Sequence, residues 1–166
     1  MGMQTRIITK SSQETIDFAK DFVKKALKGA KNDSPLIFCL SGELGAGKTY
    51  FVKGLAEALG IKDNITSPTF VLMKKYKIRK KVEKAGPGPA FAAGKGMFFH
   101  IDCYRIYDSE DARQIGLDKI LQNPRAIIAV EWAERIADLI PRPFFKIKFK
   151  HAGEGKRKIV VKNVQR

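Results

Sequence analysis

The chain of 166 residues has the length of one domain, and its composition argues against a disordered or a membrane-spanning protein. Hydrophobic residues make up 44% and charged residues 30%, as in ordinary globular domains. No run reaches the roughly 18 apolar residues of a membrane span, and the N-terminus lacks the apolar core of a signal peptide. We therefore expect residues 1–166 to form a single domain outside the membrane.

The net charge of +15 is concentrated in two stretches. Seven basic residues and one acid, Glu83, lie between Lys74 and Lys84. Nine basic residues and one acid, Glu154, lie between Arg142 and Arg166. Such fields attract polyanions, which favours a nucleic acid or an acidic partner. The alternative is a basic surface that only keeps the protein soluble.

The first elements in chain order are a strand and a capped helix. The β-branched residues of Thr5–Thr9 predict the strand. Ser11 and Glu14 stand three residues apart before a run with helical apolar spacing, which predicts a helix that ends near Lys28.

The next segment, Leu36–Leu40, is continuously apolar and typical of a strand buried on both faces of a parallel sheet. A glycine-rich loop follows it, and Thr49–Leu59 then predicts a helix that Gly60 ends. The pattern is therefore strand, loop and helix.

The second half of the chain reads as short elements joined by turns. Residues 79–96 carry two Gly-Pro pairs and a lysine cluster, which favours an exposed insertion loop. The other expected elements are strands at Phe70–Ile78, Met97–Asp102 and Ala126–Val130, helix within Ser109–Leu121, short helix or turn at Trp132–Leu139, and a hairpin of Phe144–Lys150 with Lys158–Lys162.

The two cysteines, Cys39 and Cys103, each lie in an apolar, strand-like run, which favours buried thiols over a disulfide or a metal pair. Unpaired thiols are typical of a reducing compartment. We therefore expect a cytoplasmic protein.

The strongest motif is the Walker A pattern G-x4-G-K-[ST]. Its glycines allow backbone N–H groups to turn toward a phosphate, and the following helix adds its positive N-terminus. In such P-loops the lysine reaches the β- and γ-phosphates and the hydroxyl of the last residue binds Mg2+. The residues expected to bind nucleotide are Gly42, Glu43, Leu44, Gly45, Ala46, Gly47, Lys48 and Thr49.

Two acids follow apolar strands and are candidates for the second acidic group that a P-loop enzyme needs near magnesium. Glu131 follows Ala126–Val130, and Asp102 ends Met97–Asp102. Carboxyl ends of parallel strands are where ligands bind in open α/β sheets. The alternative for each acid is that it caps the turn after its strand.

The sequence lacks the Asn-Lys-x-Asp pattern of guanine-specific GTPases, so we expect ATP as the nucleotide. Two other functions stay open at this point. A small P-loop kinase would transfer the γ-phosphate to an acceptor, and an ATP-gated binding module would bind RNA in a salt-sensitive way.

Four segments together resemble one family. They are Ser41–Thr49, Thr66–Phe70, His100–Arg105 and Val130–Trp132. Their order and separation are similar to those of the TsaE (YjeE) family, P-loop ATPases of bacterial tRNA threonylcarbamoyladenosine (t6A) biosynthesis. The resemblance implies a P-loop NTPase-like, three-layer α/β fold with a central, mostly parallel sheet and an antiparallel C-terminal hairpin.

The resemblance also implies roles for single residues. Thr49 and Glu131 would bind Mg2+, and Asp102, Glu131 and Lys48 would serve ATP hydrolysis. The segment Ser67–Thr69, with Thr69 near the nucleotide, would respond to the γ-phosphate. The adenine end is expected at Ser12, Gln13 and Gly155. For Trp132 and His100, a purely structural role remains open.

The family implied by the resemblance acts with the TsaD and TsaB proteins, which carry out threonylcarbamoyl transfer. An acidic partner face or a nearby tRNA would account for the basic charge. The chain departs from a compact member of the family between Ile78 and Gly96, where the lysine-rich insertion stands.

Overall fold

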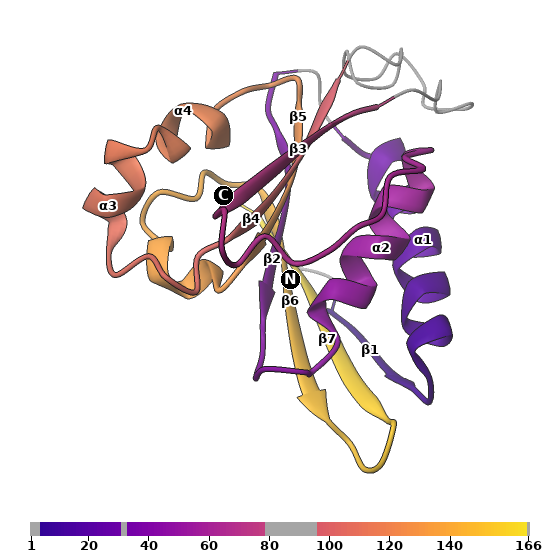
Figure 1. Ribbon diagram of the computed structural model, residues 1–166. Helices are drawn as coiled ribbons and strands as arrows, with labels where there is room; N and C mark the ends of the chain where they lie inside the picture. Colours follow the sequence, from indigo (N-terminus) through magenta and orange to yellow (C-terminus); the bar gives the residue numbers. More distant parts are fainter. Residues whose placement is uncertain (1–3, 31–32, 79–95, 166) are drawn as a thin grey trace.

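The computed structural model describes residues 4–30, 33–78 and 96–165, in which one twisted sheet has helices on both faces (Figure 1). The interpretation of residues 79–96 as an exposed loop falls outside the described residues except for Gly96. The two flanks of that segment are joined, because the N–H of Ile78 donates to the carbonyl of Gly96 at 3.2 Å. No described helix is long and apolar enough to cross a membrane.

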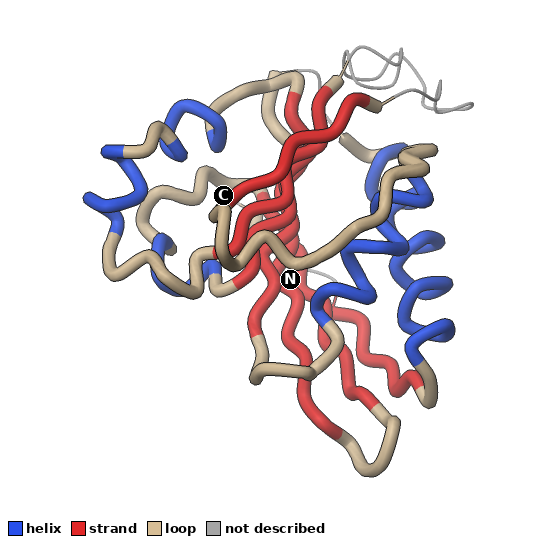
Figure 2. The backbone as a smooth tube through the Cα atoms, in the orientation of Figure 1, coloured by secondary structure: helices blue, strands red, loops and turns tan. Residues whose placement is uncertain are grey.

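The described strands lie side by side in a single sheet (Figure 2). Their order is β1-β7-β6-β2-β5-β4-β3. The central strands β6, β2, β5 and β4 run parallel, whereas β3, β7 and β1 pair antiparallel at the two sides. The predicted mixed α/β architecture with an antiparallel C-terminal hairpin is confirmed. The strands are β1 Gln4–Thr9, β2 Leu36–Ser41, β3 Met73–Lys77, β4 Met97–Asp102, β5 Ala126–Glu131, β6 Phe144–His151 and β7 Arg157–Val164.

Helices cover the two faces of the sheet unequally. On one face, α1 (Ser12–Lys28) and α2 (Lys48–Ala58) enclose the larger apolar cluster with β2, β6 and β7. On the other face, α3 (Ser109–Gln114), α4 (Leu117–Leu121) and the 3-10 turn η2 (Ala133–Ile136) enclose a second cluster with β2, β4 and β5. This second group leaves β6, β7 and β1 largely uncovered on its side.

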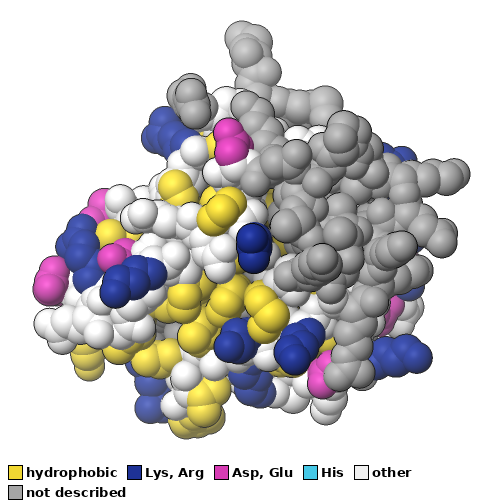
Figure 3. Space-filling model, turned by 90° about the horizontal axis from the view of Figure 1, so that it is seen from above, with side chains coloured by type: hydrophobic (Ala, Val, Ile, Leu, Met, Phe, Trp, Pro, Cys, Tyr) yellow, Lys and Arg dark blue, Asp and Glu magenta, His cyan; other side chains and the backbone are white. Residues whose placement is uncertain are grey.

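The surface at the upper end of the molecule is of mixed character. Seen from above, apolar side chains gather near its middle, with basic and acidic side chains among them (Figure 3).

Within the fold, both cysteines are buried as free thiols, as predicted. Burial raises the pKa of each thiol to about 12, so neither is a ready nucleophile or metal ligand at neutral pH.

The start of α1 has the predicted cap, with one difference. The hydroxyl of Ser11 accepts from the N–H of Glu14 at 3.1 Å, as expected. The carboxylate of Glu14, however, accepts from the N–H of Lys10 at 2.7 Å, one residue before the cap. Both bonds satisfy donors at the β1–α1 junction, so the helix start is held firmly.

One predicted strand is shorter than its pattern indicated. The strand expected from Phe70 begins at Met73, because the preceding residues form a turn in which Val71 donates to the carbonyl of Pro68 at 2.9 Å. The short helix predicted within Ser109–Leu121 is confirmed as α3 and α4, which Gly116 separates with a φ of 78°. A left-handed residue ends the helical hydrogen-bond pattern, which is why one continuous helix does not form.

Replacing Gly54 by alanine is expected to lower the free energy of unfolding by about 1–3 kcal/mol, measured by urea denaturation. A Cβ at Gly54 would overlap the carbonyl oxygen of Ile16 and press on Ala19, so α2 and α1 would have to separate. Gly29→Ala is the matched control, because a Cβ there meets only the Ala26 oxygen at 3.9 Å. Equal stability of the two variants would contradict the close helix contact.

Candidate nucleotide-binding site

The glycine-rich loop connects the end of β2 to the start of α2 at the lower edge of the sheet in Figure 1. Gly42 and Gly47 have φ values of 146° and 102°, which side-chain-bearing residues rarely adopt. A Cβ on Gly42 would also lie 2.6 Å from the carbonyl oxygen of Phe149 on β6. The loop therefore needs glycine for both its backbone shape and its packing.

Lys48, the first residue of α2, lies inside this loop. Only 5% of the residue is exposed. Its Nζ donates to the carbonyls of Gly42 at 2.6 Å and Glu43 at 3.0 Å. The same ammonium group lies 4.9 Å from the centre of the Trp132 ring. The cation is thus held where the loop and the end of β5 meet.

The electrostatic surroundings of Lys48 include two carboxylates. Burial lowers the pKa of the Lys48 ammonium, and the negative charges of Glu131 and Asp102 act in the opposite direction. Asp102 and Glu131 are register partners on the adjacent parallel strands β4 and β5. The two acids predicted from strand ends are therefore neighbours, on the same edge as the lysine.

Asp102 is bound to the segment that was expected to sense the γ-phosphate. Its Oδ2 accepts from the hydroxyls of Thr69 at 2.6 Å and Ser67 at 3.1 Å. Its Oδ1 accepts from the N–H of Tyr104 at 2.9 Å. Lys74 also donates to the hydroxyl of Thr66. A single carboxylate thus joins this loop to the end of β4.

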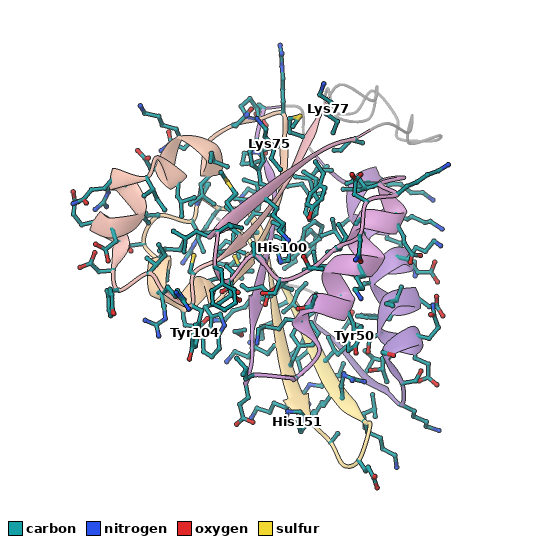
Figure 4. All side chains as sticks on the ribbon, viewed as in Figure 1. Tyr50, Lys75, Lys77, His100, Tyr104 and His151 are labelled. Carbon is teal, nitrogen blue, oxygen red and sulfur yellow. The ribbon has the colours of Figure 1, made fainter. Side chains whose placement is uncertain are left out.

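Glu131 forms a buried pair with His100 from the neighbouring strand. His100 Nε2 lies 2.7 Å from Glu131 Oε1, and the two side chains are 0% and 5% exposed. The Nδ1 atom of His100 has no hydrogen-bond partner among the described residues. Figure 4 shows His100 in the middle of the sheet, so the histidine positions Glu131 from within the fold.

Trp132 owes its place to an unusual backbone conformation. Its φ of 56° is left-handed, and its N–H donates to the carbonyl of Leu40 at 3.1 Å. The chain therefore turns sharply after Glu131 and brings the indole over Lys48. The ring also packs against Tyr104, with 5.2 Å between centroids. The geometry puts Trp132 at the candidate site.

The oxygen atoms available near the loop suit magnesium. Thr49 offers a hydroxyl as the second residue of α2, and Glu131 offers a carboxylate at the end of β5. The described residues contain no group of three or more acidic, histidine or cysteine side chains arranged for a metal. Magnesium is usually held by one or two protein oxygens together with phosphates and waters, so this small donor set fits it.

Arg157 lies beside the glycine-rich loop at the candidate site, although the sequence did not point to it. A Cβ on Gly47 would lie 2.6 Å from its Cδ, and its guanidinium is 5.2 Å from the centre of the Tyr50 ring. Its Nη1 donates to the carbonyl of Gly155 at 3.2 Å, while its Nε is buried without a partner among the described residues. In the sequence, Arg157 is one cation in a basic hairpin, and no pattern distinguishes it.

The residues expected at the adenine end lie on the same side of the loop as Arg157. Gly155 belongs to the turn between β6 and β7, and a Cβ there would lie 3.7 Å from the carbonyl of Lys10. Ser12 is the first residue of α1, and Gln13 follows it with its amide directed to Asp17 at 3.0 Å. The turn and the helix start therefore adjoin each other.

A cavity of about 770 Å³ lies elsewhere, between α1, β1 and the start of β6. None of the residues expected to bind nucleotide lines it. P-loops hold phosphates mainly through backbone N–H groups at an open sheet edge, so a deep cavity is not required there. The geometry of the loop is the better guide to the site.

Comparisons with known proteins agree on one family. The model of the family described as threonylcarbamoyl adenosine biosynthesis protein TsaE matches residues 9–159. The tRNA threonylcarbamoyladenosine biosynthesis protein TsaE of Treponema pallidum is 31% identical over 156 residues, which cover 94% of this chain and 98% of that protein. The TsaE protein of Borreliella burgdorferi is 35% identical, with 89% and 92% covered.

A solved structure supports the same assignment. The crystal structure of YdiB from Bacillus subtilis superposes with a TM-score of 0.68 at 30% sequence identity. The match covers 99% of this chain and 88% of YdiB. Sequence and fold thus agree over nearly the whole molecule, and the chain belongs to the TsaE family of threonylcarbamoyl adenosine biosynthesis proteins.

Proposed function

We propose that this protein binds ATP with Mg2+ at Gly42–Thr49 and hydrolyses it, in support of t6A modification of tRNA. The observation that carries the proposal is the meeting of three groups at one sheet edge. These are the ammonium of Lys48 in the loop and the adjacent carboxylates of Asp102 and Glu131. A P-loop hydrolase needs a cation that contacts the phosphates and acidic groups that hold the metal ion or orient water, and these three residues supply both kinds of group.

Lys48 and the loop N–H groups bind the β- and γ-phosphates in this proposal. Lys48 acts as a point charge whose partial burial strengthens its attraction to phosphate oxygen. Thr49 and Glu131 hold Mg2+, which supplies charge neutralisation on the phosphates. His100 keeps the Glu131 carboxylate oriented through their buried hydrogen bond.

Asp102 has the geometry of a residue that couples hydrolysis to a loop. Its carboxylate accepts hydrogen bonds from the hydroxyls of Thr69 and Ser67, so movement of that segment would break these bonds and leave the carboxylate without them. A γ-phosphate oxygen competes for the same hydroxyl donors. Release of Asp102 by that exchange frees a carboxylate to orient the attacking water.

The adenosine end lies toward Ser12, Gln13 and Gly155 in this proposal. Arg157 links that end to the loop, because it contacts Gly47 and hydrogen-bonds Gly155. Its stacking over Tyr50 holds the guanidinium in place. The basic hairpin thereby contributes one positioning residue to the nucleotide site.

The partners in the proposed function are TsaD and TsaB, with this chain supplying ATP turnover and not the threonylcarbamoyl transfer itself. Its support is membership of the family, whose relatives are named for t6A biosynthesis in tRNA. The two buried thiols and the absence of a membrane-spanning helix among the described residues agree with a site of action at cytoplasmic tRNA.

The test is an ATPase assay of the purified chain alone and with TsaD and TsaB from the same organism. We expect slow release of inorganic phosphate from the chain alone and at least a severalfold acceleration with both partners. Labelled γ-phosphate should appear as free phosphate. Transfer of the label to a small-molecule acceptor would identify a kinase instead, and fast turnover without partners would contradict the proposed dependence.

A further inference from the structure

One face of the β6–β7–β1 part of the sheet carries lysines in a regular array. On β6 and β7, the side chains of Ile147, Phe149, Ile159 and Val161 belong to the apolar cluster under α1 and α2. Because side chains alternate along a strand, their neighbours point to the opposite face. The cations on that opposite face are Arg6, Lys146, Lys148, Lys150, Lys158 and Lys162.

The array brings like charges directly together. Lys146 is the register partner of Lys162, and Lys150 is the register partner of Lys158. All four side chains are exposed. Like charges opposite one another across a strand pair repel, and none of these lysines forms an ion pair with a described residue. The face therefore presents positive charge that the described protein does not neutralise.

The described helices leave this array open to solvent. The helices α3 and α4 lie beside the part of the sheet that contains β4 and β5, and the β6–β7 hairpin projects beyond them (Figure 1). The turn η2 and the residues after it lie beside β6, where Glu134, Lys146 and Lys148 line a recess of about 290 Å³. In contrast to the mixed surface of Figure 3, the rows of the array contain no acid.

The chemistry of the array favours RNA over an acidic protein. The cores of protein–protein interfaces are depleted of lysine and enriched in aromatic residues. Here, the apolar side chains within the three rows are Ile8, Val160 and, at the end away from the glycine-rich loop, Val164 and Phe144. Phe144 is the one aromatic residue of the rows, and it packs against the second apolar cluster and not among the lysines. Lysines at alternate positions recur about every 7 Å along a strand, which suits a ligand with a repeating negative charge. A phosphodiester backbone is such a ligand.

The array also adjoins the nucleotide loop. Lys148 is the register partner of Ser41, the residue before Gly42. On β7, Lys158 follows Arg157, which contacts Gly47 of the loop. A backbone lying on the array would therefore run past the edge at which the phosphates of a nucleotide are expected.

We propose that the lysine array of β6, β7 and β1 binds the phosphate backbone of RNA, independently of base sequence. The site deepens the proposed function, since it gives the protein a direct contact with the RNA whose modification its family serves. It does not require ATP, however, and can therefore be tested in the absence of nucleotide. Failure of ATP hydrolysis and failure of RNA binding would then be separate results.

The test measures binding of a fluorescently labelled tRNA transcript by anisotropy, with the full chain and without nucleotide, over about 50–200 mM salt. We expect the triple variant Lys146→Glu, Lys150→Glu, Lys158→Glu to raise Kd at least tenfold. Its slope of log Kd against log salt should fall by roughly 2–3, because three phosphate contacts are lost. An unrelated single-stranded RNA should show the same loss.

The matched control is Lys24→Glu, Lys62→Glu, Lys119→Glu, which changes the net charge equally at exposed positions on α1, in the loop after α2 and on α4. It should keep Kd within about threefold, since long-range charge is screened at these salt concentrations. Equal loss in both triple variants would overturn the proposal, as would unchanged RNA affinity of the array variant.

Two further measurements complete the test. The first uses charge-reversal variants of Lys75 and Lys77 on β3, which lie far from the end of the β6–β7 hairpin at His151 (Figure 4). If RNA binding were lost only in these variants, the RNA would contact β3 and the proposal would be overturned. Binding of anionic vesicles or an acidic polypeptide that exceeds RNA binding and depends on the same lysines would also overturn it. Thermal unfolding of each variant shows whether it is folded.

Discussion

Replacement of Lys48 by alanine is expected to abolish measurable ATP hydrolysis and to weaken ATP binding by about 10- to 100-fold. The Lys48 residue is only 5% exposed and its ammonium is already held by two carbonyl oxygens, so phosphate oxygens would receive a strong, partly desolvated charge–charge contact. The loss in turnover should exceed the loss in binding, because negative charge develops on the leaving β-phosphate oxygens in the transition state, within reach of the lysine. Calorimetric titration and a phosphate-release assay measure the two quantities.

The control for this variant is Lys62→Ala, which removes an exposed lysine shortly after α2. It should bind and hydrolyse ATP like the unmodified chain. Because Lys48 also bonds the carbonyls of Gly42 and Glu43, thermal unfolding without nucleotide is needed to detect a loosened loop. Full activity of a folded Lys48→Ala protein would refute the assignment of the site.

The second large effect is expected for Glu131→Gln. The amide retains the shape of the side chain and can still bond His100, but it removes the negative charge proposed to hold Mg2+. We expect hydrolysis to fall at least 100-fold, whereas ADP binding in the presence of a chelator should change less than threefold. Substituting an amide isolates the charge from the packing, which Glu131→Ala would not.

Glu134→Gln is the matched control, since Glu134 is an exposed acid on η2 close enough to influence Lys48. Its effect on hydrolysis should be smaller than twofold. If Glu131→Gln lost chelator-treated ADP binding as strongly as it lost hydrolysis, Glu131 would act on the nucleotide itself and not through magnesium.

The sequence predicted those parts of the fold that depend on local patterns. The cap at Ser11, the buried strand Leu36–Ser41 and the loop before Lys48 each arise from residues close together in the chain. Such elements are set by capping, continuous apolar runs and glycine conformations, all of which act over a few residues. They could be placed without knowledge of the sheet.

Features that depend on contacts between distant segments could be anticipated only in part. The sequence showed that Asp102 and Glu131 each stand at the end of a strand. It did not show that they are neighbours, because this depends on the pairing of β4 with β5. Arg157 could not be identified, because its role depends on the approach of the β6–β7 hairpin to Gly47. Leu72 has a left-handed φ of 61°, and β3 starts at the next residue, Met73. Nothing in the local sequence indicates this conformation.

The repelling lysines of the β6–β7 hairpin have a consequence for its stability. The apolar side chains of Ile147 and Ile159 favour the observed register, whereas the facing pairs Lys146–Lys162 and Lys150–Lys158 oppose it. Removing one lysine from each pair should therefore stabilise the free protein while weakening its hold on a polyanion. Repulsion between these lysines lowers the stability of the hairpin in the free protein. The hairpin is therefore expected to be most stable when a polyanion is bound across the lysines.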